Sequence, residues 1–135
     1  MNGTRSQEPF QPRIKTAPLF VETLGFSEDW HNLDYDDDDL LLLQGRIMAW
    51  PKAAPVIPGT GGLRKLRFVA PKQRQGKRGA TRVGYVYFEH SDIVLLVIAY
   101  AKTAQRDVLH GQKKAIRQMI VLYEKQLASN RTQTP

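Results

Sequence analysis

Cysteine is absent from the 135-residue chain, which excludes disulfide bonds and every metal site built on thiolates. Long hydrophobic runs are absent too, since the two longest, at residues 40–43 and 93–101, are too short to span a bilayer. The first residues, MNGTRSQEP, lack the apolar stretch of a secretory signal. We therefore expect a cytoplasmic protein with one compact domain.

Acidic residues are missing from residues 46–88, which carry ten lysines and arginines. Residues 19–45 show the opposite pattern, with eight acids and neither lysine nor arginine, and the net charge of the chain is +7. Segregated positive charge favours a polyanionic partner, either nucleic acid or an acidic protein, because such a partner relieves the repulsion. The alternative is that the basic strand residues are only the solvated face of a sheet.

The pattern of apolar residues predicts an α+β fold with the element order β-α-α-β-β-β-α. Residues 18–23, PLFVET, are the first expected strand. Ser27 is the expected N-cap of the first helix, because Glu28 and Asp29 would then lie in the first turn, where the helix dipole favours acids.

A second helix is expected within DYDDDDLLLLQGRIMAWP, where any of Asp34, Asp36 and Asp37 can act as N-cap and Pro51 closes the far end. The acids at 36–39 also resemble a cation site, but capping and dipole complementarity explain them better. The apolar face of this helix would hold Leu40, Leu43 and Ile47, with Leu41 and Met48 alongside.

Three further strands are expected at residues 63–68, 81–89 and 93–101. The first of them alternates, with Leu66 and Phe68 on one face and Lys65 and Arg67 on the other, which is typical of a half-buried antiparallel strand. The last is almost entirely apolar, and we expect it in the centre of the sheet, covered on both faces.

The last helix is expected from about Val108 to Leu127, where apolar residues recur at helical spacing. Both ends of the chain are polar. We therefore divide the chain into a disordered N-terminal extension at 1–17, one folded domain at 18–128 and a disordered tail at 129–135.

Four stretches together resemble toxins of the RelE/ParE superfamily, and most closely its HigB-like branch. They are VIPGTGGLRKLRF, GKRGATRVGYVYF, LLVIAYAK and KKAIRQMI. The resemblance implies a type II toxin with two N-terminal helices and a C-terminal helix packed on a small antiparallel sheet. It also implies a metal-independent endoribonuclease that cleaves mRNA in the ribosomal A site and so inhibits translation. The implied partners are the ribosome, mRNA and a cognate antitoxin of helix-turn-helix type.

The resemblance also implies roles for individual residues. In RelE-like enzymes, cations on the second and third strands contact the scissile phosphate, which makes Lys65, Arg67 and Arg82 the expected catalytic residues. The expected contacts with RNA and the ribosome are Arg64, Lys72, Arg74, Lys77, Arg78 and Lys102. Leu109 stands where the family places a tyrosine near the start of its last helix, so Tyr100 and His110 are candidates for an accessory acid or base.

Cations can supply most of this chemistry without a metal. Attack of a ribose 2′-OH on its own 3′-phosphate needs alignment, a proton acceptor and stabilisation of charge on the phosphoryl oxygens. Other cations around Lys65 would disfavour its charged form, which is the condition for a base. Arg67 and Arg82 stay protonated and suit binding of the phosphate.

No cofactor is expected. His31, His90 and His110 lie too far apart in sequence, and in contexts too unlike, to form a set of metal ligands. Two other functions stay open, because a shared fold does not fix a function. One is a ParE-like poison of DNA gyrase, and the other is an inactive module that binds nucleic acid or antitoxin.

Overall fold

The computed structural model describes residues 17–71 and 80–132. The elements in chain order are β1 (Leu19–Glu22), α1 (Leu24–Asn32), α2 (Asp37–Ala49), β2 (Arg64–Phe68), β3 (Thr81–Phe88), β4 (Ile93–Ala101) and α3 (His110–Thr132). A short 3-10 helix, η2 (Glu89–Ser91), connects β3 to β4. The predicted α+β class and the order β-α-α-β-β-β-α are confirmed.

The four strands form one sheet in the order β1-β4-β3-β2. β3 is antiparallel to both of its neighbours, β2 and β4, whereas β1 pairs with β4 in parallel. The sheet is therefore mixed rather than wholly antiparallel, which is possible because a long crossover separates β1 from β4 in the chain. β4 lies between β1 and β3 and is buried over most of its length, which confirms its predicted central position.

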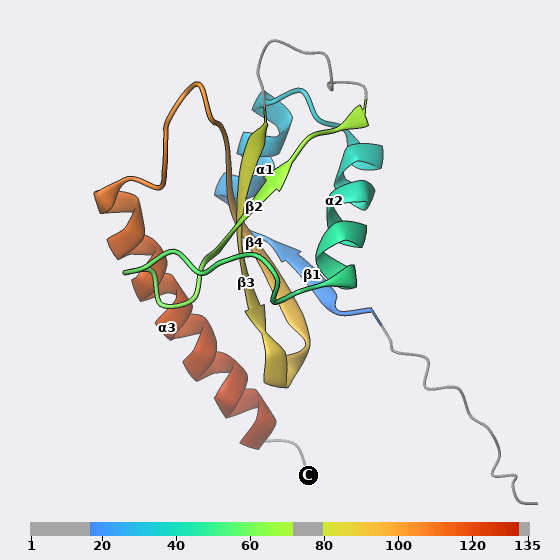
Figure 1. Ribbon diagram of the computed structural model, residues 1–135. Helices are drawn as coiled ribbons and strands as arrows, with labels where there is room; N and C mark the ends of the chain where they lie inside the picture. Colours follow the sequence, from blue (N-terminus) through green and yellow to red (C-terminus); the bar gives the residue numbers. More distant parts are fainter. Residues whose placement is uncertain (1–16, 72–79, 133–135) are drawn as a thin grey trace, which may run out of the picture.

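Helices cover both faces of the sheet, with α3 on one side and α1 and α2 on the other (Figure 1). On the side of α1 and α2, Phe26 and Leu43 pack in one core with Tyr85 of β3. On the side of α3, Ile116 and Ile120 pack in a second core. Side chains alternate between these two faces along the strands, except at the register shift beside Gly84 and Tyr85, where the consecutive Val97 and Ile98 of β4 both pack in the second core.

The first helix starts earlier than the sequence predicts. Thr23, not Ser27, is the N-cap: its hydroxyl accepts from the backbone N–H of Phe26 at 3.0 Å and donates to the carbonyl of Val97 at 2.9 Å. Ser27 lies inside the helix, where its N–H donates to the Thr23 carbonyl. The prediction was wrong because the contact of Thr23 with β4 is not visible in the local sequence.

The second helix starts as predicted, at one of the candidate aspartates. Asp36 is its N-cap and forms a capping box with Asp39, each side chain accepting from the other residue's backbone N–H at 2.9 Å. The acids at 37–39 lie in the first turn, where the helix dipole favours them. This arrangement accounts for the acidic run as a helix start.

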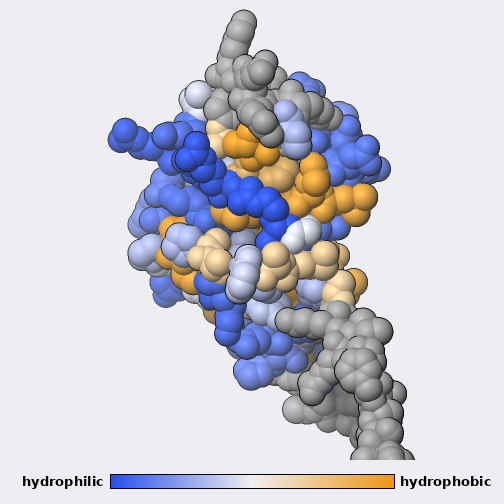
Figure 2. Space-filling model, turned by 45° about the vertical axis from the view of Figure 1, so that its right-hand side comes forward, coloured by the Kyte–Doolittle hydropathy of each residue, from blue (hydrophilic) through white to orange (hydrophobic). Residues whose placement is uncertain are grey.

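The side of the molecule that carries α2 shows hydrophobic residues next to hydrophilic ones (Figure 2). Leu43 and Ile47 are buried in the core as predicted. Leu41 and Met48, which were expected beside them, are exposed instead, because each is turned away from the face that Leu43 and Ile47 bury. Trp50, just after the helix, is 74% exposed.

The last helix runs to Thr132, past its predicted end at Leu127. The first residues of the expected tail are therefore helical, whereas residues 1–16 and 133–135 lie outside the described part of the chain. Within the described part, no helix combines the length and the apolar character that crossing a membrane requires.

Candidate functional site

Strand pairing brings three of the predicted site residues into a line across the sheet. Arg67 on β2 lies opposite Arg82 on β3, and Arg82 lies opposite Tyr100 on β4. Directly paired residues of antiparallel strands point to the same face. That face is the one covered by α3, because Tyr100 belongs to the same core as Ile116 and Ile120. We call Arg67, Arg82 and Tyr100 the cationic row.

Two polar atoms of the cationic row are buried and find no partner in the described part of the chain. Tyr100 is 6% exposed, and neither its hydroxyl nor Nη1 of Arg82 has a hydrogen-bond partner among the described residues. Burial raises the pKa of the Tyr100 phenol; the nearby carboxylate of Asp107 adds to the rise, and Arg82 opposes it. Tyr100 therefore carries its proton at neutral pH. An unpaired buried polar group lowers the stability of the fold by roughly 1–3 kcal/mol. Folding alone therefore does not explain why the Tyr100 hydroxyl and Nη1 of Arg82 are buried in this way.

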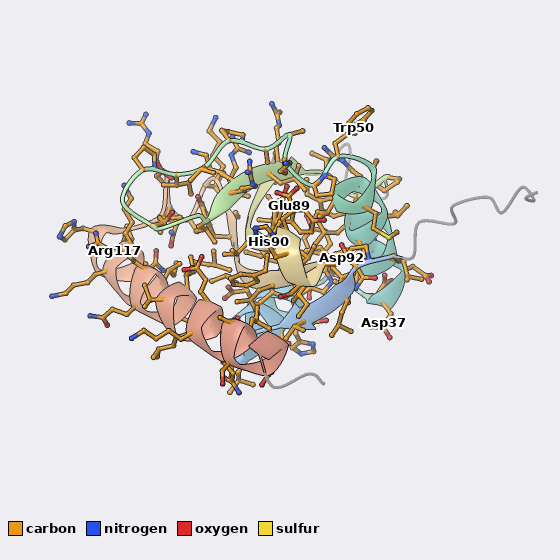
Figure 3. All side chains as sticks on the ribbon, turned by 90° about the horizontal axis from the view of Figure 1, so that it is seen from below. Asp37, Trp50, Glu89, His90, Asp92 and Arg117 are labelled. Atoms are coloured by element: carbon orange, nitrogen blue, oxygen red, sulfur yellow. The ribbon has the colours of Figure 1, made fainter. Side chains whose placement is uncertain are left out.

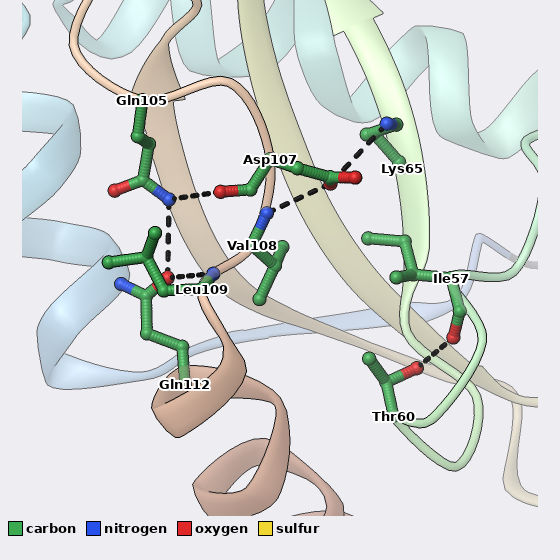
Figure 4. A network of polar contacts seen from close by, with 8 residues as sticks. All are labelled: Ile57, Thr60, Lys65, Gln105, Asp107, Val108, Leu109 and Gln112. Atoms are coloured by element: carbon green, nitrogen blue, oxygen red, sulfur yellow. Dashed lines mark hydrogen bonds and ion pairs between the residues drawn. The ribbon is translucent and has the colours of Figure 1, made fainter.

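Lys65 lies two residues before Arg67 on the same face of β2. Its ammonium group forms an ion pair with Oδ1 of Asp107 at 3.4 Å, and the same oxygen accepts from the backbone N–H of Val108 at 2.8 Å (Figure 4). That backbone hydrogen bond, followed by the charge of Lys65, lowers the pKa of Asp107. The partner of Lys65 is thus a carboxylate, whereas the hypothesis that Lys65 acts as a base requires cations as its neighbours.

The loop that carries Asp107 is held to the start of α3 by glutamine side chains (Figure 4). The side-chain amide of Gln105 donates to the backbone carbonyl of Asp107 at 2.9 Å and to Oε1 of Gln112 at 3.2 Å. The same Oε1 accepts from the backbone N–H of Leu109 at 2.8 Å, as one half of a capping box does. Asp107 is therefore in a fixed position relative to Lys65.

Asp107 is the functional candidate that the sequence analysis missed. It is an acid just before a helix, a position where a capping role is the ordinary explanation. Only its contact with Lys65, 42 positions away in sequence, sets it apart. The isolated acid after the basic strands was the available signal, but nothing in the local pattern connects it to Lys65.

Gly84 on β3 lies next to Lys65 and is covered by apolar side chains. It pairs with Lys65 on one side and with Ile98 on the other. A Cβ atom at Gly84 would lie 2.7 Å from Cγ2 of Ile98 and 3.1 Å from Cδ2 of Leu63. Only glycine lets these two apolar side chains close over the middle strand.

The other predicted residues are not members of the cationic row. Arg64 alternates to the opposite face of β2 and donates from Nη1 to the carbonyls of Lys52 at 3.0 Å and Ala54 at 2.7 Å, so it anchors the loop after α2. Lys102 lies just past the end of β4, exposed, next to Ala80. His110 lines a hollow beside α3. Lys72, Arg74, Lys77 and Arg78 lie outside the described residues.

The site is suited to an anion. In residues 17–71 and 80–132, no group of three or more His, Asp or Glu side chains is arranged to hold a metal ion. What the sheet presents instead is Lys65, Arg67 and Arg82, with one protonated phenol beside them. Ammonium and guanidinium groups donate several charge-assisted hydrogen bonds to phosphate oxygens, and the phenol can donate one proton.

Comparison with known proteins gives a distant structural likeness. The chain is similar to a double arginine-to-alanine mutant of the E. coli toxin RelE in the free state, with 11% sequence identity and a TM-score of 0.47. The match covers 67% of this chain and 90% of the RelE chain. No protein-family model matches the chain. A likeness at this level carries no conclusion about activity.

Proposed function

We propose that the protein is the toxin of a toxin–antitoxin system, of the RelE/ParE superfamily and its HigB-like branch, and that it cleaves mRNA on the ribosome. The observation that carries the proposal is the cationic row, where Arg82 and Tyr100 pair across two strands and a buried nitrogen of the one and the buried hydroxyl of the other have no partner among the described residues. Groups kept unpaired at a cost in stability are expected where a ligand satisfies them.

The substrate phosphate would bind over the cationic row. Arg82 is only partly buried, so the rest of its guanidinium group can contact a phosphoryl oxygen, with the exposed Arg67 beside it. Lys65 would contribute a third positive charge, aligned by its ion pair with Asp107. Together they stabilise the charge that builds up on the phosphate in the transition state.

The proposed reaction is attack of the ribose 2′-hydroxyl on the adjacent phosphorus, with the proton of that hydroxyl passing to solvent water. The bond from phosphorus to the 5′-oxygen of the next nucleotide breaks, which leaves a 2′,3′-cyclic phosphate and a 5′-hydroxyl. Tyr100 is our candidate for the group that donates the proton to the leaving 5′-oxygen, because it pairs with Arg82 in the row and its protonated hydroxyl has no partner among the described residues. The ion pair of Lys65 favours electrostatic stabilisation over proton transfer as its role.

The proposed partners follow from the same charge distribution. A cognate antitoxin would cover the cationic face and neutralise it, and a helix-turn-helix in that antitoxin belongs to the resemblance alone. The ribosome would supply the aligned mRNA, because a set of cations holds a phosphate but reads no sequence. Cytoplasmic location is part of the proposal, since ribosomes are there.

The test is cleavage of a defined mRNA on programmed ribosomes, mapped by primer extension. We compare the wild-type protein with the Arg67→Ala, Arg82→Ala double variant and with Lys65→Ala, and we expect losses of about tenfold to a thousandfold per residue. Arg46→Ala with Lys52→Ala removes two cations outside the cationic row and is the matched control. Codon-phased cuts that disappear only in the site variants support the proposal.

Uncut mRNA with the wild-type protein would refute it. In that case, inhibition of DNA gyrase by wild-type protein is the next assay, because a gyrase poison would retain its activity when Arg67 and Arg82 are replaced. Cuts that persist at the wild-type rate in all site variants would show that the nuclease site lies elsewhere.

A further inference from the structure

A basic hollow, separate from the cationic row, lies between α3 and the turn that precedes β2. It has a volume of about 550 Å³ and is lined by Pro58, Gly59, His110, Lys113, Lys114, Arg117 and Gln118. Arg117 lies on the part of α3 that is nearest to this turn (Figure 3). No acidic residue is among the described residues that line the hollow. We call it the α3 hollow.

The wall opposite α3 is a rigid turn. The hydroxyl of Thr60, which is fully buried, donates to the carbonyl of Ile57 at 2.7 Å and accepts from the backbone N–H of Leu63 at 3.0 Å. Gly61 has φ +81°, which disfavours any side chain, and a Cβ atom there would lie 3.4 Å from Cγ of Arg117. The glycine turn therefore packs against the aliphatic part of Arg117 and leaves its charged end for a ligand.

The stability of α3 does not explain the cations. The first turn of α3 contains no acid, although acids are the residues that stabilise the start of a helix. Lys113 and Arg117 are four residues apart and Lys114 and Arg117 three apart, so like charges lie next to each other on the helix surface and repel. A bound polyanion would relieve this repulsion.

The α3 hollow is next to the candidate site. A smaller hollow of about 170 Å³ is lined by Lys65 and Asp107 together with Pro58, and Pro58 also lines the α3 hollow. The two hollows thus share one lining residue and are neighbours. Their cations come from β2 and α3, and a chain of anions can pass from one hollow to the other.

We propose that the α3 hollow binds the sugar-phosphate backbone of RNA, as a second subsite beside the cationic row; the choice of RNA as ligand rests on the proposed function. Phosphate backbones are bound by cations alone, without apolar anchors. A protein partner is expected to insert large apolar or aromatic side chains, but the lining of the hollow is cations, a glutamine, a glycine and a proline. The exposed Val121 and Leu122 of α3 are not part of the lining.

The test measures binding of a short single-stranded RNA by fluorescence anisotropy over a series of salt concentrations. The RNA carries 2′-O-methyl groups, so it cannot be cleaved, and no ribosome is present. The test variant is Lys113→Gln, Lys114→Gln, Arg117→Gln. The control variant is Arg46→Gln, Lys52→Gln, Lys125→Gln, which removes the same charge from positions outside both hollows. Circular dichroism checks that both variants are folded.

The result expected is a weaker salt dependence of RNA binding in the test variant only. Each cation that contacts a phosphate contributes about 0.7 to the slope of log K against log salt for single strands, so three cations correspond to a decrease of about two. Equal slopes in the two variants would overturn the α3 hollow as a subsite, and codon-phased cleavage by the wild-type protein would still leave the proposed function intact. Wild-type protein that binds oligo-aspartate in preference to RNA would overturn RNA as the ligand.

Discussion

Replacing Tyr100 by phenylalanine separates the function of the cationic row from its contribution to folding. The change removes one hydroxyl that is buried and has no hydrogen-bond partner among the described residues. Because an unpaired buried hydroxyl costs roughly 1–3 kcal/mol, its removal is expected to stabilise the protein by about 1 kcal/mol. For a domain of this size that corresponds to a rise in Tm of about 3–5 °C.

The same change is expected to lower mRNA cleavage. If Tyr100 donates the proton to the leaving 5′-oxygen, the variant should lose on the order of 100-fold in single-turnover cleavage on ribosomes. A more stable but less active protein is the combination that a strained functional group produces. Tyr123→Phe on α3 is a matched control, because Tyr123 lies outside the row and packs against Phe88.

The pH dependence gives an independent check on the buried phenol. Burial raises the pKa of Tyr100 above 10.0, so the folded protein holds this proton when the unfolded chain has lost it. The wild-type protein therefore keeps this contribution to its stability in full below pH 10.0 and loses it as the pH rises through the folded-state pKa of Tyr100. Tyr100→Phe should therefore lose less stability than wild type in alkaline solution. A variant that is less stable than wild type at pH 7 and keeps full cleavage would refute the reasoning.

Three further substitutions test the elements that position the site, each by thermal and urea unfolding. Gly84→Ala should lower the free energy of unfolding by about 1–3 kcal/mol, because the new Cβ atom would lie 2.7 Å from the Ile98 side chain. An unchanged unfolding midpoint would mean that this side chain can move aside at no cost. Asp36→Ala should cost about 1 kcal/mol by removing the capping box of α2, and no loss would show that the cap is not formed in solution. Asp107→Asn should cost less than about 1 kcal/mol; since the pKa of Asp107 is lowered from 3.8, the difference from wild type should be present above pH 3.8 and vanish in stronger acid. A difference that persists in acid would contradict the ion pair with Lys65.

The sequence predicts the architecture because its signals are local. The alternation around Lys65 and Arg67 identifies β2, and the continuous apolar run at 93–101 identifies the central strand β4. The acids at 36–39 identify the start of α2. The start of α1 was missed because Thr23 is held by β4, a contact between residues 74 positions apart.

The candidate site is predicted less completely, because it depends on register and on contacts that are distant in sequence. That Arg67, Arg82 and Tyr100 lie in one line follows only from the pairing of three strands. The opposite orientation of Arg64 follows from alternation, but its contacts with Lys52 and Ala54 require the path of the loop after α2.

The central claim is that the cationic row cleaves RNA by attack of a 2′-hydroxyl, and one measurement tests it most directly. Programmed ribosomes present either an all-ribose mRNA or the same mRNA with a single 2′-deoxynucleotide at the mapped cleavage position, and the cut is read by primer extension. We predict a cut in the all-ribose message with wild-type protein, no cut with Arg67→Ala, Arg82→Ala, and no cut in the 2′-deoxy message with either protein. Cleavage of the 2′-deoxy message at the same position would contradict the account.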